Sequence, residues 1–317
     1  MDDLRVFFRS AQGEVPAVRG VSLELERGEA VALVGESGCG KSVTAASVLG
    51  LVGASATVSG VIRFEGRDVT RLPAPELRRL RGRDIGMVFQ DPMTSLDPCF
   101  SVGYQLGEAL VPARLPRGEV RRRCVELLAD LGVPEPEVRL AAHPGQLSGG
   151  LRQRVMIAIA TACRPKLLIA DEPTTALDVT VQAQIMELLR RLRDERQMAL
   201  LLITHDLGLV AHNASRVVVM YAGLAVEEAA TRTLFADPLH PYTRGLLGSL
   251  PGARGHRRGQ RLLAIPGAVP HPARVPAGCP FRDRCTLAVA ACGDCVPNLD
   301  EKAPGHRVRC WRVVCST

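Results

Sequence analysis

Eight consecutive residues carry the clearest chemistry in the chain: Gly35-Glu36-Ser37-Gly38-Cys39-Gly40-Lys41-Ser42. They form the pattern G-x-x-x-x-G-K-S, in which the glycines let the backbone wrap a phosphate with its N–H groups turned inward. In this pattern the lysine reaches the β- and γ-phosphates and the serine hydroxyl ligates Mg²⁺. The alternative interpretation is a glycine-rich turn that leads into a helix and binds nothing.

The residues on either side of this loop favour phosphate binding. Residues 30–34 form a short apolar run that is typical of a buried parallel strand. Residues 43–51 are rich in Ala, Val and Leu and predict a helix, whose positive end faces the loop. Strand, loop, lysine, hydroxyl and helix follow in the order that nucleotide binding requires.

Polar side chains end three later strands in the predicted sheet. Residues 167–170 lead into Asp171 and Glu172; the first acid suits Mg²⁺, and the second can polarise a water for attack on the γ-phosphate. Gln90 ends the strand expected at residues 84–90 and could reach Mg²⁺ or that water. His205 follows residues 199–203 and could contact the γ-phosphate. Taken alone, the glutamine is usually just a loop residue, and the histidine is more often structural.

A second anion site is predicted at Leu147-Ser148-Gly149-Gly150-Leu151. Apolar residues repeat at helical spacing from Leu151 onward, so the two glycines stand at a helix N-terminus. Alone, this stretch would be an ordinary N-cap. Residues 174–178 predict a tight turn ending at Asp178, before a helix at 179–193.

Other elements are expected around this core. Strands are predicted at 4–8, 17–25 and 60–69, helices at 106–111 and 119–131, and a hairpin at 217–227. The early strands suit an antiparallel sheet beside a parallel one. Phe7 and Phe8 are candidates to stack on an adenine ring, with Phe8 preferred; core packing is the alternative.

Bulk composition narrows the class of protein. The chain has 317 residues, 46% hydrophobic and only 3% aromatic, with a net charge of +7, so its core is aliphatic and its surface basic. Apolar runs are too short to span a bilayer, and the acidic start of the chain lacks a signal-peptide pattern. A protein in the cytosol, or peripheral on the cytoplasmic side of a membrane, is therefore expected.

The C-terminal part differs from the rest. Residues 251–276 are rich in Pro, Gly and Arg and predict an extended linker. Six of the ten cysteines then follow: Cys279, Cys285, Cys292, Cys295, Cys310 and Cys315. In a reducing compartment this density indicates a metal. Only Cys292 and Cys295 have the C-x₂-C spacing usual for zinc, whereas iron–sulfur clusters accept wider spacing. Zinc and buried free thiols stay open as alternatives.

The order of these motifs from Leu4 to about Glu228 resembles the ATPase subunits of ABC transporters. The resemblance implies ATP and Mg²⁺ sandwiched between two such domains, with Glu172 as catalytic base assisted by Lys41, Gln90 and His205. It implies Mg²⁺ contacts from Ser42, Gln90 and Asp171, and a site acting across the dimer made by Leu147, Ser148, Gly149, Gly150, Leu151 and Asp178. The implied ATP contacts are Phe8, Gly35, Glu36, Ser37, Gly38, Cys39, Gly40, Lys41, Ser42, Val43, Gln90, Asp171 and His205.

Residues 87–98, 147–154 and 238–243 more narrowly resemble the oligopeptide/dipeptide/nickel importer group, with departures at Gly145, Leu151 and Leu224-Ala225. That resemblance implies a [4Fe–4S] cluster on Cys279, Cys285, Cys292 and Cys310. Arg282, Arg284, Arg307 and Arg309 lie near these cysteines in the sequence and could offset the thiolate charge. It implies a second ATPase subunit (a heterodimer, with a homodimer open), two permease subunits and an extracytoplasmic solute-binding protein, at the cytoplasmic face of the inner membrane.

The expected fold is an α/β P-loop ATPase core with an antiparallel β subdomain and a helical subdomain at about 96–162. The ATPase domain is predicted at 1–250, and a small irregular cysteine-rich module at 251–317. The expected activity is ATP hydrolysis that powers import of peptides. The alternatives are a nickel importer ATPase, a soluble ABC-type ATPase acting on nucleic acid, and a nucleotide-dependent iron–sulfur sensor. One P-loop and the segment His240-Pro241-Tyr242-Thr243 argue against the nucleic-acid class.

Overall fold

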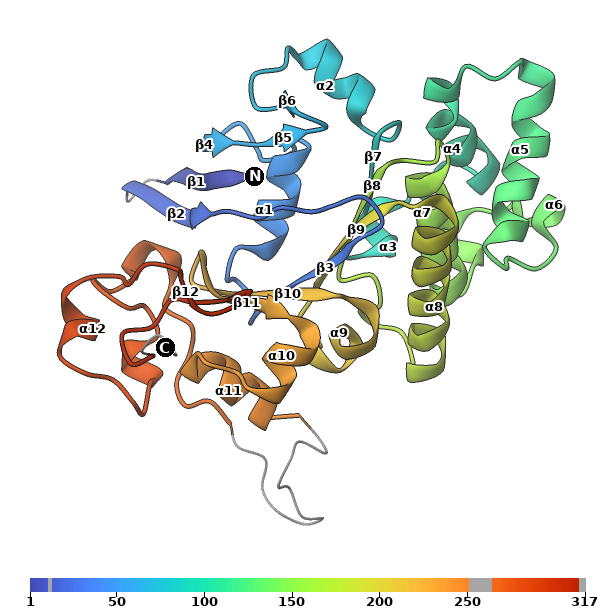
Figure 1. Ribbon diagram of the computed structural model, residues 1–317. Coiled ribbons are helices and arrows are strands. Elements are labelled where there is room, and N and C mark those ends of the chain that lie inside the picture. Colours follow the sequence, from blue (N-terminus) through green and yellow to red (C-terminus); the bar gives the residue numbers. More distant parts are fainter. Residues whose placement is uncertain (11–12, 251–263, 314–317) are drawn as a thin grey trace. The chain divides into compact units, whose positions relative to one another are not determined.

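The computed structural model describes residues 1–10, 13–250 and 264–313 (Figure 1). The chain divides into two compact units. The first contains Met1–Glu24, Ala30–Arg71 and Thr204–Thr317, and the second contains Leu25–Glu29 and Leu72–Ile203. Each unit is built on strands of the expected α/β fold.

An antiparallel sheet in the first unit has the strand order β2-β1-β4. Its strands are β1 (Asp2–Ser10), β2 (Gly13–Val21) and β4 (Ala56–Val61). The single strand predicted at 60–69 is wrong. Glu65 and Gly66 both have positive φ, 48° and 79°, and form the two-residue turn between β5 (Arg63–Phe64) and β6 (Arg67–Asp68).

The remaining strands of the first unit surround the strand that precedes the P-loop. β3 (Ala30–Val34) is buried at every position and pairs in parallel with β10 (Arg216–Tyr221). Burial on both faces is typical of parallel strands and explains the unbroken apolar run in the sequence. β11 (Leu224–Ala230) then pairs antiparallel with β10, which confirms the predicted hairpin.

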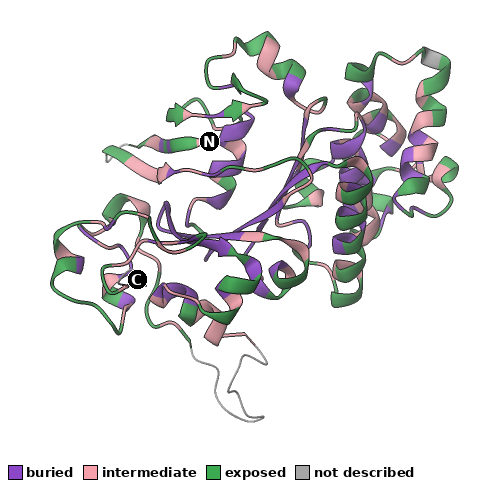
Figure 2. Ribbon diagram, viewed as in Figure 1, coloured by how far each residue is buried: buried purple, intermediate pink, exposed green. Residues whose placement is uncertain are grey.

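Helices of the first unit lie against these strands. α9 (Leu207–Asn213) contacts β3, and α10 (Thr231–Ala236) contacts both β10 and β11 (Figure 1). Buried residues concentrate in the strands of this sheet (Figure 2). The helices are α1 (Lys41–Val48), α9 (Leu207–Asn213), α10 (Thr231–Ala236), α11 (Pro241–Gly248) and α12 (Ala291–Asp294), with short 3₁₀ turns η3 (Pro272–Arg274) and η4 (Arg282–Arg284).

The C-terminal extension is part of the first unit, and the expectation of a separate irregular module is not supported. β13 (His306–Val308) pairs antiparallel with β11, and β12 (Asp300–Ala303) pairs with β13. Phe281 is buried in the same apolar cluster as Tyr221 and Tyr242, and Ile265 packs against it. The extension therefore completes a sheet and a core that the rest of the unit begins. Residues 251–263 of the predicted linker lie outside the described residues.

The second unit holds the parallel strands β7 (Ile85–Val88), β8 (Leu167–Asp171) and β9 (Ala199–Thr204) in the order β9-β8-β7. Its helices are α2 (Ala74–Leu80), α3 (Pro92–Ser95), α4 (Val102–Ala109), α5 (Arg117–Asp130), α6 (Pro136–Arg139), α7 (Gly149–Thr161) and α8 (Val179–Arg196), with 3₁₀ turns η1 (Val111–Ala113) and η2 (Pro144–Gln146). α7 is central, because it contacts α3, α4, α5, α8 and β7.

One helix boundary in this unit follows a local cap and not the apolar spacing. The helix predicted at 106–111 instead runs from Val102, because the hydroxyl of Ser101 accepts a hydrogen bond from the N–H of Tyr104 and fixes an earlier start. The helix predicted at 119–131 is confirmed as α5, and Cys124, Leu127 and Leu128 are buried along it.

Candidate nucleotide-binding site

The loop between β3 and α1 has the backbone that a phosphate cradle needs. Gly35, Gly38 and Gly40 have φ values of 153°, 79° and 99°. The last two lie in the left-handed region, which glycine enters without steric cost. A Cβ at Gly35 would collide with the carbonyl oxygen of Met220, and one at Gly40 with the carbonyl oxygen of Ala17. At Gly35 and Gly40 the close approach of neighbouring backbone therefore leaves room only for glycine.

Helix α1 begins at Lys41 without a side-chain cap and without an acidic residue in its first turn. The N-terminal N–H groups of such a helix attract anions. Lys41 is 5% exposed, and its Nζ donates to the carbonyl oxygens of Gly35 (2.7 Å) and Glu36 (3.0 Å). Ser37, Gly38 and Ser42 are exposed. The loop therefore presents an open, positively polarised surface, which fits a phosphate group.

Residues from the C-terminal third hold this loop, and the sequence motifs gave no sign of them. The N–H of Glu36 donates to Tyr242 Oη (2.8 Å), and Arg284 forms two hydrogen bonds with the Glu36 carboxylate (2.7 and 3.0 Å). Arg284 also donates to Tyr221 Oη (3.2 Å). Tyr242 lies in the segment that resembles the importer group, but that resemblance assigned it no role.

In the second unit, β8 ends where the two predicted acids stand. Asp171 is 4% exposed and is the last residue of the strand. Glu172 has a φ of 47°, so its backbone turns sharply out of the strand. Its Oε2 accepts hydrogen bonds from Gln90 Nε2 (3.1 Å) and Thr175 Oγ1 (2.9 Å). The structure thus brings Gln90 and Glu172 together, while their catalytic roles stay predictions.

The second predicted anion site is a capped helix end in the same unit. Ser148 is the N-cap of α7, and its Oγ accepts a hydrogen bond from the N–H of Leu151 (3.4 Å). Gly150 allows close packing, because a Cβ there would stand 2.8 Å from a methyl carbon of Val181 in α8. Asp178 caps α8 and accepts hydrogen bonds from the N–H groups of Thr180 and Val181 (both 3.0 Å). Ser148, Gly149 and Leu151 are accessible at least in part.

The remaining nucleotide contacts were predicted at His205 and Phe8. His205 is exposed and immediately follows β9. Phe8 is half-buried in β1, opposite Val15 and Ala56 in the neighbouring strands. Phe7 is half-buried as well, so burial does not distinguish the two. The roles of these residues stay predictions.

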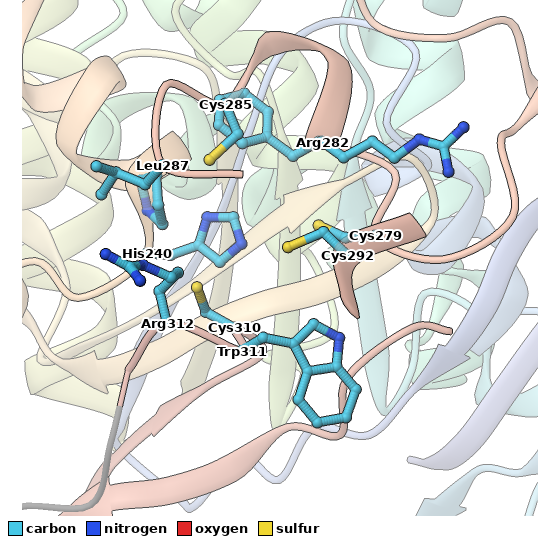
Figure 3. A pocket seen from close by; sticks show the side chains of 11 residues that line it. His240, Cys279, Arg282, Cys285, Leu287, Cys292, Cys310, Trp311 and Arg312 are labelled. Carbon is cyan, nitrogen blue, oxygen red and sulfur yellow. The ribbon is translucent and has the colours of Figure 1, made fainter. Parts of the chain in front are cut away.

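Four cysteines line one cavity in the first unit (Figure 3). They are Cys279, Cys285, Cys292 and Cys310, with His240, Phe281 and Trp311 among the other lining residues. The backbone ties two of them together, since the N–H of Cys279 donates to the carbonyl oxygen of Cys292 (2.9 Å). Cys295 is exposed and does not line the cavity, and Cys315 lies outside the described residues.

Three of the thiols in this cavity, those of Cys279, Cys285 and Cys310, have raised pKa values. Burial, with the neighbouring thiols of Cys292, Cys310 and Cys285, raises the pKa of Cys279 to about 11, and burial also raises the pKa of Cys285 and Cys310. Metal binding would therefore release protons.

The predicted metal centre is not confirmed. Within the described part of the chain, no three His, Cys, Asp or Glu side chains lie close enough together to hold one metal ion. The arginines expected to offset thiolate charge have other partners as well. Arg284 pairs with Glu36, Arg307 with Glu228, and Arg309 donates to the carbonyl oxygens of Ala225 and Pro297.

No helix in residues 1–10, 13–250 and 264–313 is long and apolar enough to cross a membrane.

Comparisons with known proteins agree with this geometry. Residues 18–175 match the ABC transporter family, and residues 226–292 match the oligopeptide/dipeptide transporter C-terminal region. The dipeptide transport ATP-binding protein DppD of Bacillus subtilis is 46% identical over 98% of this chain and 93% of its own length. The oligopeptide transport ATP-binding protein OppD of Escherichia coli is 47% identical over 98% of this chain and 92% of its own length.

Solved structures give the same result. A dimeric ATP-binding cassette in a post-hydrolysis state, bound to ADP and phosphate, matches with a TM-score of 0.66 and 29% identity over 73% of this chain and 97% of that chain. The matched length, the P-loop and the C-terminal region point to one family. The chain belongs to the ATP-binding subunits of ABC transporters, within the group that carries the oligopeptide/dipeptide transporter C-terminal region.

Proposed function

We propose that this chain binds MgATP at Gly35–Ser42 and hydrolyses it to power the import of dipeptides or oligopeptides. The observation that carries the proposal is the cradle formed by the glycines of the loop and the uncapped start of α1, with Lys41 bonded to the loop carbonyls. The peptide substrate is inferred from the relatives, which are named for dipeptide and oligopeptide transport. Nickel import and action on nucleic acid have no such support.

Each predicted site residue would have its own role in ATP binding or hydrolysis. Lys41 would leave the loop carbonyls to pair with the β- and γ-phosphates, and Ser42 and Asp171 are oxygen donors of the type that Mg²⁺ prefers. Bound Mg²⁺ would neutralise phosphate charge. Glu172 would accept a proton from the attacking water, with Gln90 holding its carboxylate through the 3.1 Å hydrogen bond. His205 would contact the γ-phosphate.

We place the chain in a complex on the cytoplasmic face of the membrane. Its partners would be a second ATPase subunit, two permease subunits and an extracytoplasmic solute-binding protein. The α7 start, with Leu147–Leu151, and Asp178 would complete the ATP site of the partner ATPase. A related cassette of solved structure is dimeric. We favour a heterodimer, as in the group that the sequence resembles.

Reconstitution tests this function. The chain, a second ATPase subunit, the permeases and a solute-binding protein should show ATPase activity that rises when the binding protein carries a peptide. Lys41→Ala should abolish that activity because nucleotide is no longer positioned, while the complex still assembles. Stimulation by Ni²⁺ but not by peptide, or by DNA without permeases, would replace the proposal with one of its alternatives.

We also propose that the cysteine cavity holds a [4Fe–4S] cluster on Cys279, Cys285, Cys292 and Cys310. Four soft thiol donors line the cavity, and they come from separate parts of the extension. A cluster spans more space than one ion, so its ligands need not converge on a single point, as zinc would require. The role would be structural, because the extension is short and Phe281 packs into the core of the first unit, which leaves the extension little core of its own.

Anaerobic purification tests this cofactor. The protein should be brown and contain about four irons per chain. Cys285→Ser should lower the iron content, whereas Cys295→Ser, at an exposed cysteine outside the cavity, should leave it unchanged. A colourless protein with one zinc per chain would refute the assignment.

A further inference from the structure

The P-loop is held from outside by the C-terminal third of the chain. Glu36, the second residue of the loop, is bonded through its backbone N–H to Tyr242 and through its carboxylate to Arg284. All of these residues belong to the first unit. The loop conformation thus depends on a side chain 248 residues further along the sequence.

Arg284 differs from an ordinary surface ion-pair partner. It is only 8% exposed, and its Nε donates to the carbonyl oxygen of Pro266 (2.8 Å) while the two other nitrogens reach the Glu36 carboxylate. Its guanidinium carbon lies 5.7 Å from the ring centre of Tyr221 and 5.8 Å from that of Phe281. The bidentate pairing with Glu36 and the ring contacts both depend on the planar guanidinium group. Together they hold the Arg284 side chain in one conformation.

The bond to Glu36 acts on the nucleotide site in two ways. First, the carbonyl oxygens of Gly35 and Glu36 are the ones that hold Lys41, so fixing Glu36 also fixes the resting place of the lysine. A loop ordered before its ligand arrives loses less entropy on binding. Second, Arg284 neutralises a carboxylate that would otherwise repel the phosphates of the nucleotide.

We propose that Arg284 is a positioning residue for nucleotide binding, which acts by holding Glu36 and thereby the P-loop. The proposal rests on the proposed role of Gly35–Ser42 as the phosphate site. Arg284 closes the turn η4, and the next residue is Cys285 of the cysteine cavity. The extension therefore contributes a residue that positions the P-loop, besides any cofactor that it holds.

Four variants and a control test this role in the full chain, by titration with a fluorescent ATP analogue in the presence of Mg²⁺. Arg284→Met keeps the length and ring contacts but removes the charge, and it should weaken binding about tenfold, which corresponds to about 1.4 kcal/mol. Arg284→Lys keeps the charge without the two-pronged geometry and should recover part of the loss. The control Arg274→Met makes the same change at an exposed arginine of the same extension and should bind as wild type does.

Glu36→Gln and the double variant separate positioning from simple destabilisation. If Arg284 acts through Glu36, then adding Arg284→Met to Glu36→Gln should cost much less than tenfold, because the unpaired carboxylate is already gone. A loss of the same size in both backgrounds would overturn the proposal, as would wild-type affinity in Arg284→Met or an equal loss in Arg274→Met. If Arg284→Met fails to fold, Arg284→Lys and Glu36→Gln still give the comparison. A wild-type chain that binds no nucleotide would instead overturn the proposed phosphate site.

Discussion

Replacing His306 with alanine measures how firmly the last strand holds the extension to the sheet. His306 lies in β13 and is 2% exposed, and its Nε2 stands 2.7 Å from Oε1 of Glu227. Glu227 is fully buried and also accepts hydrogen bonds from the N–H groups of Leu239 (2.6 Å) and His240 (3.0 Å). His306→Ala removes from this buried carboxylate the donor that β13 supplies.

The structure sets the size of the effect. Removing one partner of a buried pair costs about 3–5 kcal/mol when the remaining charge is uncompensated. Because two backbone donors remain, we expect the lower end, a loss of about 3 kcal/mol in the free energy of unfolding. His306→Gln keeps an N–H donor and should lose only about 1 kcal/mol.

The single tryptophan provides the assay. Trp311 lies in the extension, and its Nε1 donates to the carbonyl oxygen of Cys295 (3.2 Å), so its fluorescence follows that region during urea unfolding. The midpoint of His306→Ala should fall by about 1 M urea or more. Equal midpoints for His306→Ala and wild type at pH 7 would refute the reasoning, and so would an equal loss in His306→Gln.

The pH dependence has a definite sign. Burial raises the pKa of Glu227, but the interactions with His306, with the Thr243 hydroxyl and with the two backbone N–H groups outweigh burial and hold that pKa below its usual 4.5. A carboxylate with a lowered folded-state pKa adds stability above its unfolded pKa and loses it as the pH falls through the folded value. The advantage of wild type over His306→Ala should therefore be full at pH 7 and shrink below pH 4.5.

Three further substitutions test the second unit. Glu172→Gln should slow ATP hydrolysis by ~10²–10⁴-fold while nucleotide still binds, since only the general base is lost; turnover near wild type would show that another group is the base. Asp178→Ala removes both hydrogen bonds of the α8 cap and should lower the free energy of unfolding in urea by about 1 kcal/mol. Asp178→Asn keeps a cap acceptor and should retain most of the wild-type stability. Gly86→Ala would drive a Cβ into the carbonyl oxygen of Ala160 and should cost about 1–3 kcal/mol, whereas Gly118→Ala, with open space around it, should be neutral or stabilising. A neutral Gly86→Ala would contradict that close approach.

Parts of the fold that depend on neighbouring residues could be predicted from the sequence. The strand, loop and helix around Lys41 follow one another directly in the sequence, so apolar runs were enough to predict them. The Ser148 cap is two residues from Gly150, so cap chemistry was enough to predict the start of that helix. Pairings across the chain could not be predicted in this way. Arg284 is one of 40 basic residues, and nothing near it in sequence marks Glu36 as its partner.

The two C-terminal strands were missed for a related reason. β12 and β13 are four and three residues long and carry charged side chains, so they lack the apolar alternation that marks a strand. They form because β11 offers an unpaired edge, with Glu227 and Glu228 facing Val308 and Arg307. The reason that these two strands form therefore lies in β11 and not in their own residues.

The distance between Glu36 and Arg284 also sets an order of events during synthesis. The two residues are 248 positions apart, which at ~5–20 residues per second means roughly 10–50 s between their translation. A second, shorter interval covers the 79 positions from Glu227 to His306, during which β11 is an open sheet edge and the carboxylate of Glu227 still lacks its partner. The P-loop is therefore translated early, whereas Arg284, which holds it through Glu36, is translated near the end of synthesis. A chain cut short before the extension would carry every ATPase motif and still lack the residue that steadies its P-loop.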